Sequence, residues 1–240
     1  MDGHDLLPSL PRRLWAALLD LLLPQSCAGC GGSSGPLCGQ CRALLERRPH
    51  LCAPRPGCPP VWAAGPYAGL YRKVLLAYKE GGADALAAPL GRCLAAAYEA
   101  SGLAGPDTVL VPVPGRGPPH DPRAPVARLA AACPARGGGQ VLPLLRHRGR
   151  ARRQAGLDRA GRLANRRGAF TAGRVPNGVA GAPVVVVDDV VTTGATVAEA
   201  ARALGEAGLR VVGAVALTER AARGRPGPGR RRERRFYPHS

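Results

Sequence analysis

The sequence VVVVDDVVTTGAT at residues 184–196 decides the fold, because it joins a strand, a turn and the start of a helix. Its four consecutive valines are typical of a strand buried on both faces of a parallel sheet. Residues 195–207 have a helical pattern that Gly208 is expected to end, and a second apolar strand is expected at 211–217. A strand, a helix and a strand in this order predict a βαβ unit with a parallel sheet.

The polar residues of this stretch predict a phosphate site. Open α/β sheets bind ligands at the carboxyl ends of their strands, which is where Asp188 and Asp189 lie in the sequence. The next turn opens a helix, so its backbone N–H groups and the helix N-terminus can receive an anion. Gly194 would let the backbone approach that anion closely. Hydroxyl donors come from Thr192, Thr193 and Thr196.

The two carboxylates suit a different part of a ligand. They would repel a phosphate, whereas they can accept hydrogen bonds from sugar hydroxyls or bind Mg²⁺ together with substrate phosphates. A simpler interpretation is a helix cap, in which a carboxylate and a threonine satisfy the first N–H groups of the helix. An isolated Asp-x-x-Thr would favour the cap, and the complete stretch favours the ligand site.

The whole stretch resembles the signature of the phosphoribosyltransferase family, which binds 5-phosphoribosyl-1-pyrophosphate (PRPP). The resemblance implies an α/β fold of type I phosphoribosyltransferase-like architecture, a parallel sheet flanked by helices, with PRPP and Mg²⁺ as ligands. It implies that Asp188 and Asp189 hold the ribose 2′- and 3′-hydroxyls and are catalytic. The 5-phosphate is implied to lie in the turn, so the PRPP-binding residues also include Val190, Val191, Thr192, Thr193, Gly194, Ala195 and Thr196.

The order of the other motifs resembles one branch, the ComF/GntX family of competence-protein-F relatives. That order is a cysteine-rich N-terminus, YRKVLLAYKEGG at 71–82, VLVPVP at 109–114, an Arg/Gly stretch, RARRQAGLDRAGRLANRRGAF at 150–170, and the signature. The resemblance implies a PRPP-binding protein that transfers a phosphoribosyl group to an unidentified acceptor. The alternative is a non-catalytic accessory protein in DNA uptake, with a DNA-translocating helicase or DNA as partner.

Several single residues match the motifs of this branch. Lys79 matches a lysine before a glycine-containing turn and is implied to be catalytic. Pro114 belongs to the loop expected to approach pyrophosphate, and Arg116 to the Arg-Gly stretch that follows. Pro118 and Pro119 depart from the pattern of that stretch. Pro112 and Val113 belong with Pro114 to the loop expected to approach pyrophosphate. The Arg-Gly stretch, expected to be part of a flexible lid, also includes Gly117, His120 and Asp121. A Gln…Arg-x-x-Asn pattern of the branch is matched by Gln154, Arg162 and Asn165.

The basic residues of these motifs can be interpreted either as pyrophosphate ligands or as solvated surface residues. Loss of pyrophosphate builds negative charge on the leaving group, and a fixed Lys or Arg would stabilise that charge. Lys79 could instead be a solvated residue at a helix end, where its charge suits the helix dipole. The simpler interpretation is preferred for three arginines, which are expected in an exposed basic loop: Arg146, Arg148 and Arg150.

The cysteines near the N-terminus predict a metal site. Cys27-x-x-Cys30 and Cys38-x-x-Cys41 provide four thiolates that can converge tetrahedrally on a structural Zn²⁺. Redox-active or unbound thiols are the alternative, but a thioredoxin-like site would need a single Cys-x-x-Cys after a strand. No role is assigned to the other four cysteines, which are Cys52, Cys58, Cys93 and Cys133.

Composition divides the chain into an N-terminal helix and cysteine-rich region at 1–50, a proline-rich linker at 51–60, an α/β region at 61–220, and a disordered basic tail at 221–240. The resemblance implies that residues 61–220 are a phosphoribosyltransferase domain and that the N-terminal region is a zinc knuckle. The net charge of +18 favours acidic partners, although the nearly exclusive use of arginine over lysine indicates a coding bias.

Residues 14–23 have helical spacing and contain an acid, so an amphipathic helix is expected there in place of a signal sequence. No membrane span is expected, and the cytoplasm is the expected compartment. The sequence leaves the oligomeric state open, a homo-oligomer included.

We predict that residues 221–240 are dispensable for the fold. They contain seven arginines and three prolines without apolar periodicity, so they offer no face that a core could bury. Truncation after Arg220 should leave the melting temperature, measured by calorimetry, within a few degrees of the full chain. A large decrease would show that the tail packs on the domain.

Overall fold

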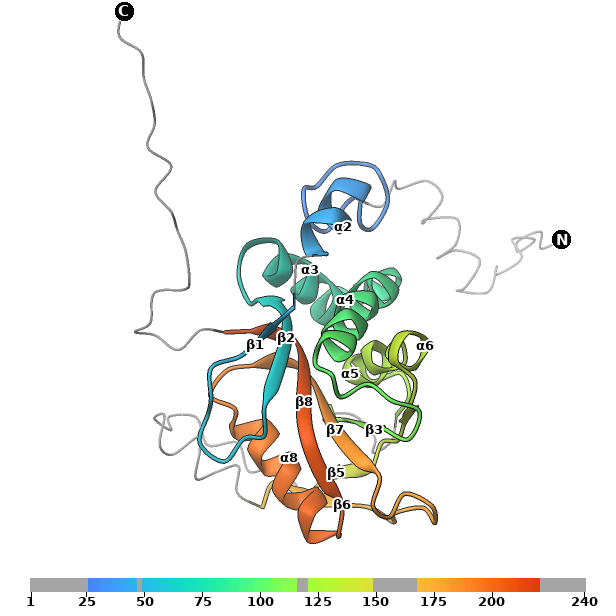
Figure 1. The fold of residues 1–240 in the computed structure, drawn as a ribbon. Coiled ribbons are helices and arrows are strands. Elements are labelled where there is room, and N and C mark those ends of the chain that lie inside the picture. Colours follow the sequence, from blue (N-terminus) through green and yellow to red (C-terminus); the bar gives the residue numbers. More distant parts are fainter. Residues whose placement is uncertain (1–25, 47–48, 116–120, 149–167, 221–240) are drawn as a thin grey trace, which may run out of the picture.

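The computed structural model describes residues 26–46, 49–115, 121–148 and 168–220, which form a twisted central sheet covered by helices (Figure 1). The sheet has six strands in the order β1-β2-β8-β7-β3-β4. All neighbours are parallel except β1 and β2. The strands are β1 (His50–Leu51), β2 (Val61–Pro66), β3 (Val109–Pro112), β4 (Gln140–Val141), β7 (Pro183–Val191) and β8 (Arg210–Glu219). The prediction of an α/β fold with a mostly parallel sheet is confirmed.

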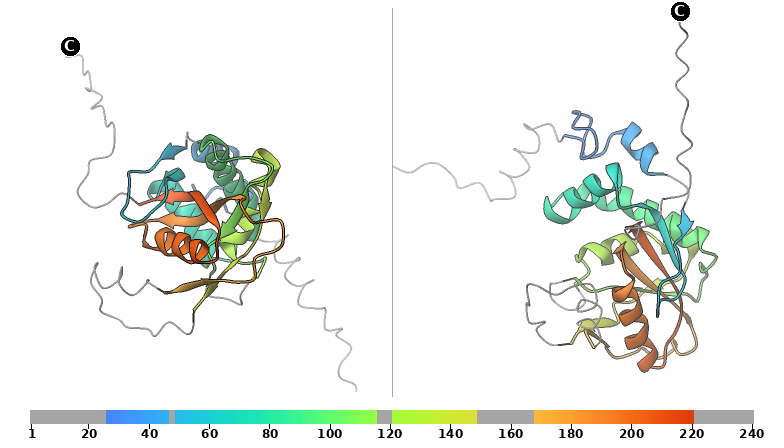
Figure 2. Two further views of the ribbon diagram at one scale, coloured as in Figure 1. Left: turned by 60° about the horizontal axis from the view of Figure 1, so that its bottom comes forward. Right: turned by 90° about the vertical axis from the view of Figure 1, so that its left-hand side faces the viewer.

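Helices cover both faces of the sheet. Figure 2 shows α4 (Ala87–Ala100) and α5 (Pro125–Ala130) on one side and α8 (Ala195–Glu206) on the other. The described part of the chain also contains α2 (Gly39–Leu45), α3 (Gly69–Glu80), the 3-10 helix η1 (Asp84–Leu86) and α6 (Pro134–Gly137). A separate antiparallel pair is formed by β5 (Leu145–His147) and β6 (Phe170–Ala172).

Strand β7 lies at the centre of both cores. Val185 and Val187 face the core on the side of α4, while Val184 and Val186 face the core on the side of α8. All four side chains are fully buried, as expected for a strand covered by helices on both faces. The strand continues to Val191, so the two acids after the valines lie within its last residues.

Residues 140–147 contain two short strands that belong to different sheets. Strand β4 ends at Val141, and β5 begins at Leu145 and pairs with β6 in the other sheet. Pro143 lies between them and has no N–H group to donate to a ladder. The helix expected at 14–23 and the tail at 221–240 lie outside the described residues. Within the described ranges, no helix has the length and apolar character needed to cross a membrane.

The N-terminal segment packs on the rest of the fold through α2 and α3. Cys27, Cys41 and Leu45 are buried in the same core as residues of α3 and α4. The buried Tyr71 hydroxyl lies 2.6 Å from the Leu45 carbonyl oxygen and 3.1 Å from that of Ala64. This hydroxyl therefore connects the end of α2 to α3 and to β2.

We expect Tyr71→Phe to weaken the attachment of α2. The substitution removes a buried donor shared by two carbonyls, which should lower the free energy of unfolding by about 1–3 kcal/mol. Hydrogen exchange should accelerate in α2 more than in the sheet.

Tyr78→Phe is the matched control, because the Tyr78 hydroxyl on the same helix donates to the Pro125 carbonyl at 2.9 Å, away from α2. Equal exchange in α2 for the two variants would contradict this role of Tyr71.

Candidate functional site

Two nearly buried acids lie near the carboxyl-terminal end of β7. Asp188 is 7% exposed and Asp189 is 8% exposed. The Asp189 N–H donates to Asp188 Oδ1 at 2.8 Å, and the Thr218 hydroxyl donates to the Asp189 carbonyl at 3.1 Å. These bonds hold the backbone of the acidic pair against β8, so the carboxylates occupy defined positions at one edge of the sheet.

Two other residues expected at the site come to this edge from different elements. Lys79, near the end of α3, forms an ion pair with Asp189, with 2.5 Å between Nζ and Oδ2. The Val113 N–H donates to the Val187 carbonyl at 2.8 Å, so Pro114 follows directly beside the acidic pair. The structure thus brings together three segments that are widely separated in the sequence.

The turn after β7 contains Thr192, Thr193 and Gly194, and α8 begins at Ala195. Its last residue before the helix, Gly194, has a left-handed conformation with φ of +82°. The Ala195 N–H lies 3.4 Å from the Thr193 hydroxyl oxygen. The N–H groups of a first helical turn have no carbonyl acceptor within their own helix, and the helix dipole adds positive potential there. The turn can therefore receive an anion.

The structure adds two reasons for glycine at 194. A left-handed φ is strained for residues with a side chain. In addition, a Cβ atom would lie 2.4 Å from Cys58 Sγ and 2.8 Å from Arg55 Cδ. The segment that contains these two residues therefore lies directly against the turn.

Sequence reasoning missed this segment, which it treated as a linker. Cys58 Sγ lies 3.1 Å from the Gly194 carbonyl oxygen, and Arg55 Nε donates to the Thr192 carbonyl at 2.9 Å. Burial raises the pKa of the Cys58 thiol, so the thiol keeps its proton and acts as a donor. No local signal could have revealed these contacts, because their partners lie more than a hundred residues away in the sequence.

The guanidinium of Arg55 connects three elements. Besides its bond to Thr192, it donates to the Ala53 carbonyl at 2.9 Å and to Glu219 Oε1 at 2.5 Å. The other Glu219 oxygen lies 2.8 Å from His50 Nε2. Burial would raise the pKa of Glu219, but the hydrogen bonds from Arg55 and His50 outweigh that effect and lower it.

His50, Cys52 and Glu219 lie close enough together to be considered as metal ligands, with all three ligand atoms within 4.8 Å of one another. The carboxylate is already paired with the Arg55 guanidinium, whose charge opposes a cation. Burial, together with the negative charge of Glu219, raises the pKa of Cys52 to about 12, so its thiolate is scarce. We therefore assign this group to the ion-pair network.

Other residues matched by sequence lie elsewhere or outside the described ranges. Asp121 accepts a hydrogen bond from the Arg123 N–H at 2.8 Å within a local turn. Arg146 and Arg148 are exposed, as expected, but Arg146 belongs to β5 and not to a loop. The residues outside the described ranges are Arg116, Gly117, His120, Arg150, Gln154, Arg162 and Asn165.

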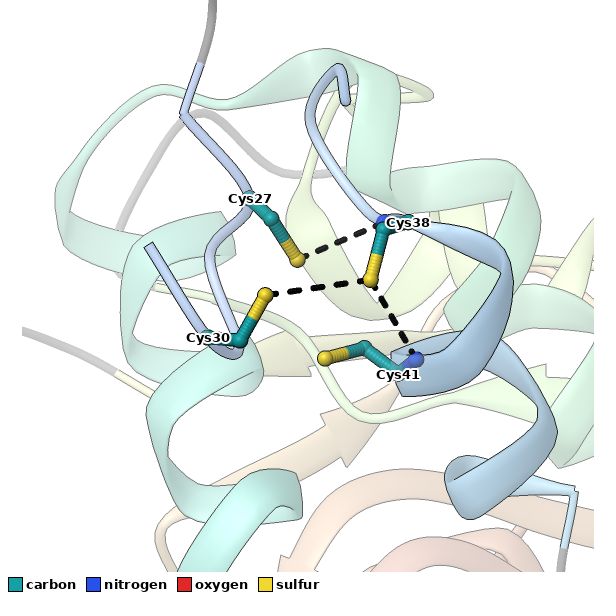
Figure 3. A group of neighbouring side chains, drawn as sticks. All are labelled: Cys27, Cys30, Cys38 and Cys41. Atoms are coloured by element: carbon teal, nitrogen blue, oxygen red, sulfur yellow. Dashed lines mark hydrogen bonds between the residues drawn. The ribbon is translucent and has the colours of Figure 1, made fainter. Parts of the chain in front are cut away.

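The four N-terminal cysteines converge on one point (Figure 3). Their sulfur atoms all lie within 4.8 Å of one another, and Cys30 Sγ is 3.8 Å from Cys38 Sγ. Four Zn–S bonds of about 2.3 Å at tetrahedral angles require S···S separations of about 3.8 Å. Cys30 and Cys38 meet this requirement, and the other sulfurs lie near enough for all four to hold a single metal ion such as zinc.

Hydrogen bonds within the knuckle support thiolates at these positions. The Cys38 N–H donates to Cys27 Sγ at 3.3 Å, and the Cys41 N–H donates to Cys38 Sγ at 3.4 Å. Burial opposes ionisation of Cys27, but backbone hydrogen bonds outweigh it and lower its pKa to about 6. Burial and the neighbouring sulfurs raise the pKa of Cys41 to about 12. Four thiolates can therefore coexist here only if a cation compensates their charge.

The comparison with known families agrees with this geometry. A family model described as the phosphoribosyl transferase domain matches residues 129–227, which include β7, the turn, α8 and β8. No curated protein matches the chain. The acidic pair, Asp188 and Asp189, and the turn at 192–194 that can receive an anion both lie within the matched residues. The chain is thus similar to phosphoribosyl transferase domains over its C-terminal part, and this similarity supports a place in the phosphoribosyltransferase superfamily.

We predict that protein purified without chelator contains about one zinc ion per chain, because a structural site contributes folding free energy directly. Cys30 is exposed, so Cys30→Ser should do little harm unless the thiolate binds metal. We expect the variant to lose zinc, measured by atomic emission, and to unfold its N-terminal segment at lower temperature.

The same substitution in chelator-treated protein is the control and should change little. A zinc-free parent with an intact N-terminal fold would refute the zinc site.

Proposed function

We propose that this chain is a phosphoribosyltransferase-like protein that binds PRPP with Mg²⁺ at the edge formed by the end of β7 and the start of α8. One observation carries the proposal. Within the family match, two nearly buried carboxylates are separated by only two valines from a helix-opening turn with N–H groups available to an anion. These two features suit the two chemically different ends of a sugar phosphate.

The acids and the turn divide the ligand between them in this proposal. Asp188 and Asp189 accept hydrogen bonds from the ribose 2′- and 3′-hydroxyls, which buried carboxylates bind strongly because such bonds are charge-assisted. The 5-phosphate lies in the turn from Thr192 to Thr196, where backbone N–H groups and threonine hydroxyls can donate to it. A carboxylate close to the phosphate would repel it, so the order along the chain separates acids from anion.

The ion pair of Lys79 with Asp189 supports a role for Lys79 beside the ribose, on the side of the pyrophosphate. When Mg²⁺ is present, it would neutralise charge on pyrophosphate, held by an acidic side chain and pyrophosphate oxygens. A ribose hydroxyl bound at Asp189 would displace the Lys79 ammonium from that carboxylate. The released Lys79 could reach the pyrophosphate and stabilise its developing negative charge, while Pro114 and Arg116 would border the same group.

The ComF branch is a further proposal, and the packing of the cysteine knuckle on α3 favours it. In this branch the chain either transfers a phosphoribosyl group to an unidentified acceptor or serves DNA uptake as a non-catalytic partner of a helicase or DNA. PRPP-dependent pyrophosphate release with a panel of bases would support transfer. Salt-dependent DNA binding that survives deletion of residues 221–240 would support the accessory role.

We predict that changes in the acids weaken PRPP binding selectively, whereas a change in the turn abolishes binding of PRPP and phosphate alike. Asp188→Asn with Asp189→Asn keeps side-chain size and removes charge, so Mg²⁺-PRPP binding should weaken by a few kcal/mol, at roughly 1.5–3 kcal/mol per charged hydrogen bond. Affinity for inorganic phosphate should stay nearly intact. Gly194→Val should abolish binding of both ligands, because its side chain strains the turn and collides with Cys58.

Calorimetric titration of both variants with PRPP and with phosphate separates these roles, and circular dichroism checks that each variant is folded. If the double Asn variant binds PRPP as tightly as the parent, the acidic pair does not recognise the ribose and helix capping becomes the better account.

A further inference from the structure

We propose that residues 53–59, which we call the strap, position the turn that receives the phosphate, with Arg55 and Glu219 as positioning residues. The inference rests on the proposed function, because it explains how that same turn is held in a receptive shape. Neither residue is placed in contact with the ligand. Both would act through the backbone of the turn.

An anion site built from N–H groups needs its carbonyl groups turned away from the anion, since a carbonyl oxygen would repel it. Three carbonyls around this turn accept hydrogen bonds from other parts of the chain. The Val191 carbonyl accepts from the Arg220 N–H at 2.8 Å, and the Thr192 carbonyl from Arg55 at 2.9 Å. The Gly194 carbonyl accepts from the Ala198 N–H at 2.8 Å and lies 3.1 Å from Cys58 Sγ.

The strap supplies the donor for the Thr192 carbonyl and a second donor, the Cys58 thiol, for the Gly194 carbonyl. Arg55 is suited to this task because its guanidinium is planar and its donors have fixed relative directions. Glu219 binds one end of the guanidinium at 2.5 Å, and the Arg55 side chain is only 10% exposed. Because the guanidinium is rigid, the bond of Glu219 to one of its nitrogens directs Arg55 Nε toward the Thr192 carbonyl. A carboxylate on β8 therefore orients the turn through Arg55.

The strap also supports the turn through packing of side chains. The space beside Gly194 is filled by the side chains of Arg55 and Cys58, so the turn cannot move toward the strap without a collision. Gly57 of the strap also faces α8, where a Cβ atom would lie 3.7 Å from that of Ala198. The strap thus supports the turn and the first residues of α8.

Removal of the Glu219 charge can distinguish a positioning role from a purely electrostatic one, because the two roles change phosphate binding in opposite directions. Glu219 is a negative charge near a proposed anion site, so removing it should strengthen phosphate binding if only charge matters. If Glu219 acts by holding Arg55, removing its acceptor atoms should weaken phosphate binding. The two explanations predict changes in opposite directions.

Glu219→Met and Glu219→Gln, made in the full chain, remove the same charge and differ in one feature. The Gln side chain keeps an acceptor oxygen for Arg55, and the Met side chain does not. We expect Met to weaken the binding of inorganic phosphate about tenfold, as for the loss of one charge-assisted hydrogen bond, while Gln binds nearly as the parent does. Isothermal calorimetry with phosphate measures both.

Glu99→Met controls for net charge, because it removes an acid that pairs with Arg136 on a remote helix. Arg55→Lys is the second test if Glu219→Met does not fold. It keeps the positive charge but loses the rigid fork, so it should also weaken phosphate binding. Equal or tighter phosphate binding by Glu219→Met than by Glu219→Gln, or parent-like binding by Arg55→Lys, would overturn the inference.

Hydrogen exchange of the turn amides separates this inference from the proposed function. If the parent binds neither phosphate nor PRPP, the proposed function fails. The positioning role of the strap is then tested by amide hydrogen exchange at residues 192–196, which should be faster in Glu219→Met than in Glu219→Gln. Equal exchange in the two variants would refute it.

Discussion

The parallel pairing of β7 with β3 and β8 is the constraint on which the rest of the structure depends. Its register places Val187 opposite Pro112 on one side and opposite Val215 on the other. The residues that follow each of these positions therefore meet at one edge of the sheet. This is why Pro114 and Glu219 lie at the same end of the sheet as the acidic pair, on opposite sides of β7.

Burial sets the chemistry of that edge. A carboxylate with little exposure to water is costly unless a cation or hydrogen-bond donors compensate it. Asp189 has Lys79 as its cation, and Glu219 has Arg55 and His50 as its donors. Asp189 and Glu219 thus have different surroundings. The partner of Asp189 is a flexible, partly exposed lysine that a ligand can displace, whereas Glu219 is held by a rigid, nearly buried arginine.

Helix α3 connects the cysteine knuckle to the candidate site. Tyr71, near its beginning, binds the end of α2, and Lys79, near its end, reaches Asp189. The knuckle and the acidic edge are therefore attached to opposite ends of one helix of 12 residues. A zinc ion that stabilises the knuckle would also help to fix the place of that helix, and with it the position of the lysine.

The sequence by itself determined the βαβ unit, the order of Asp188 and Asp189 before a helix-opening turn, and the two Cys-x-x-Cys motifs. Each of these is a local pattern of periodicity or spacing. Tertiary structure decided which distant residues complete these patterns. The ion pair of Lys79 with Asp189 and the contacts of Arg55 and Cys58 with the turn join residues far apart in the chain, up to 137 positions for Arg55 and Thr192. A proline-rich stretch has the same composition whether it is a linker or packs on a binding turn. Only the register of the strands and the packing around them determine which segments meet, and no local periodicity records that information.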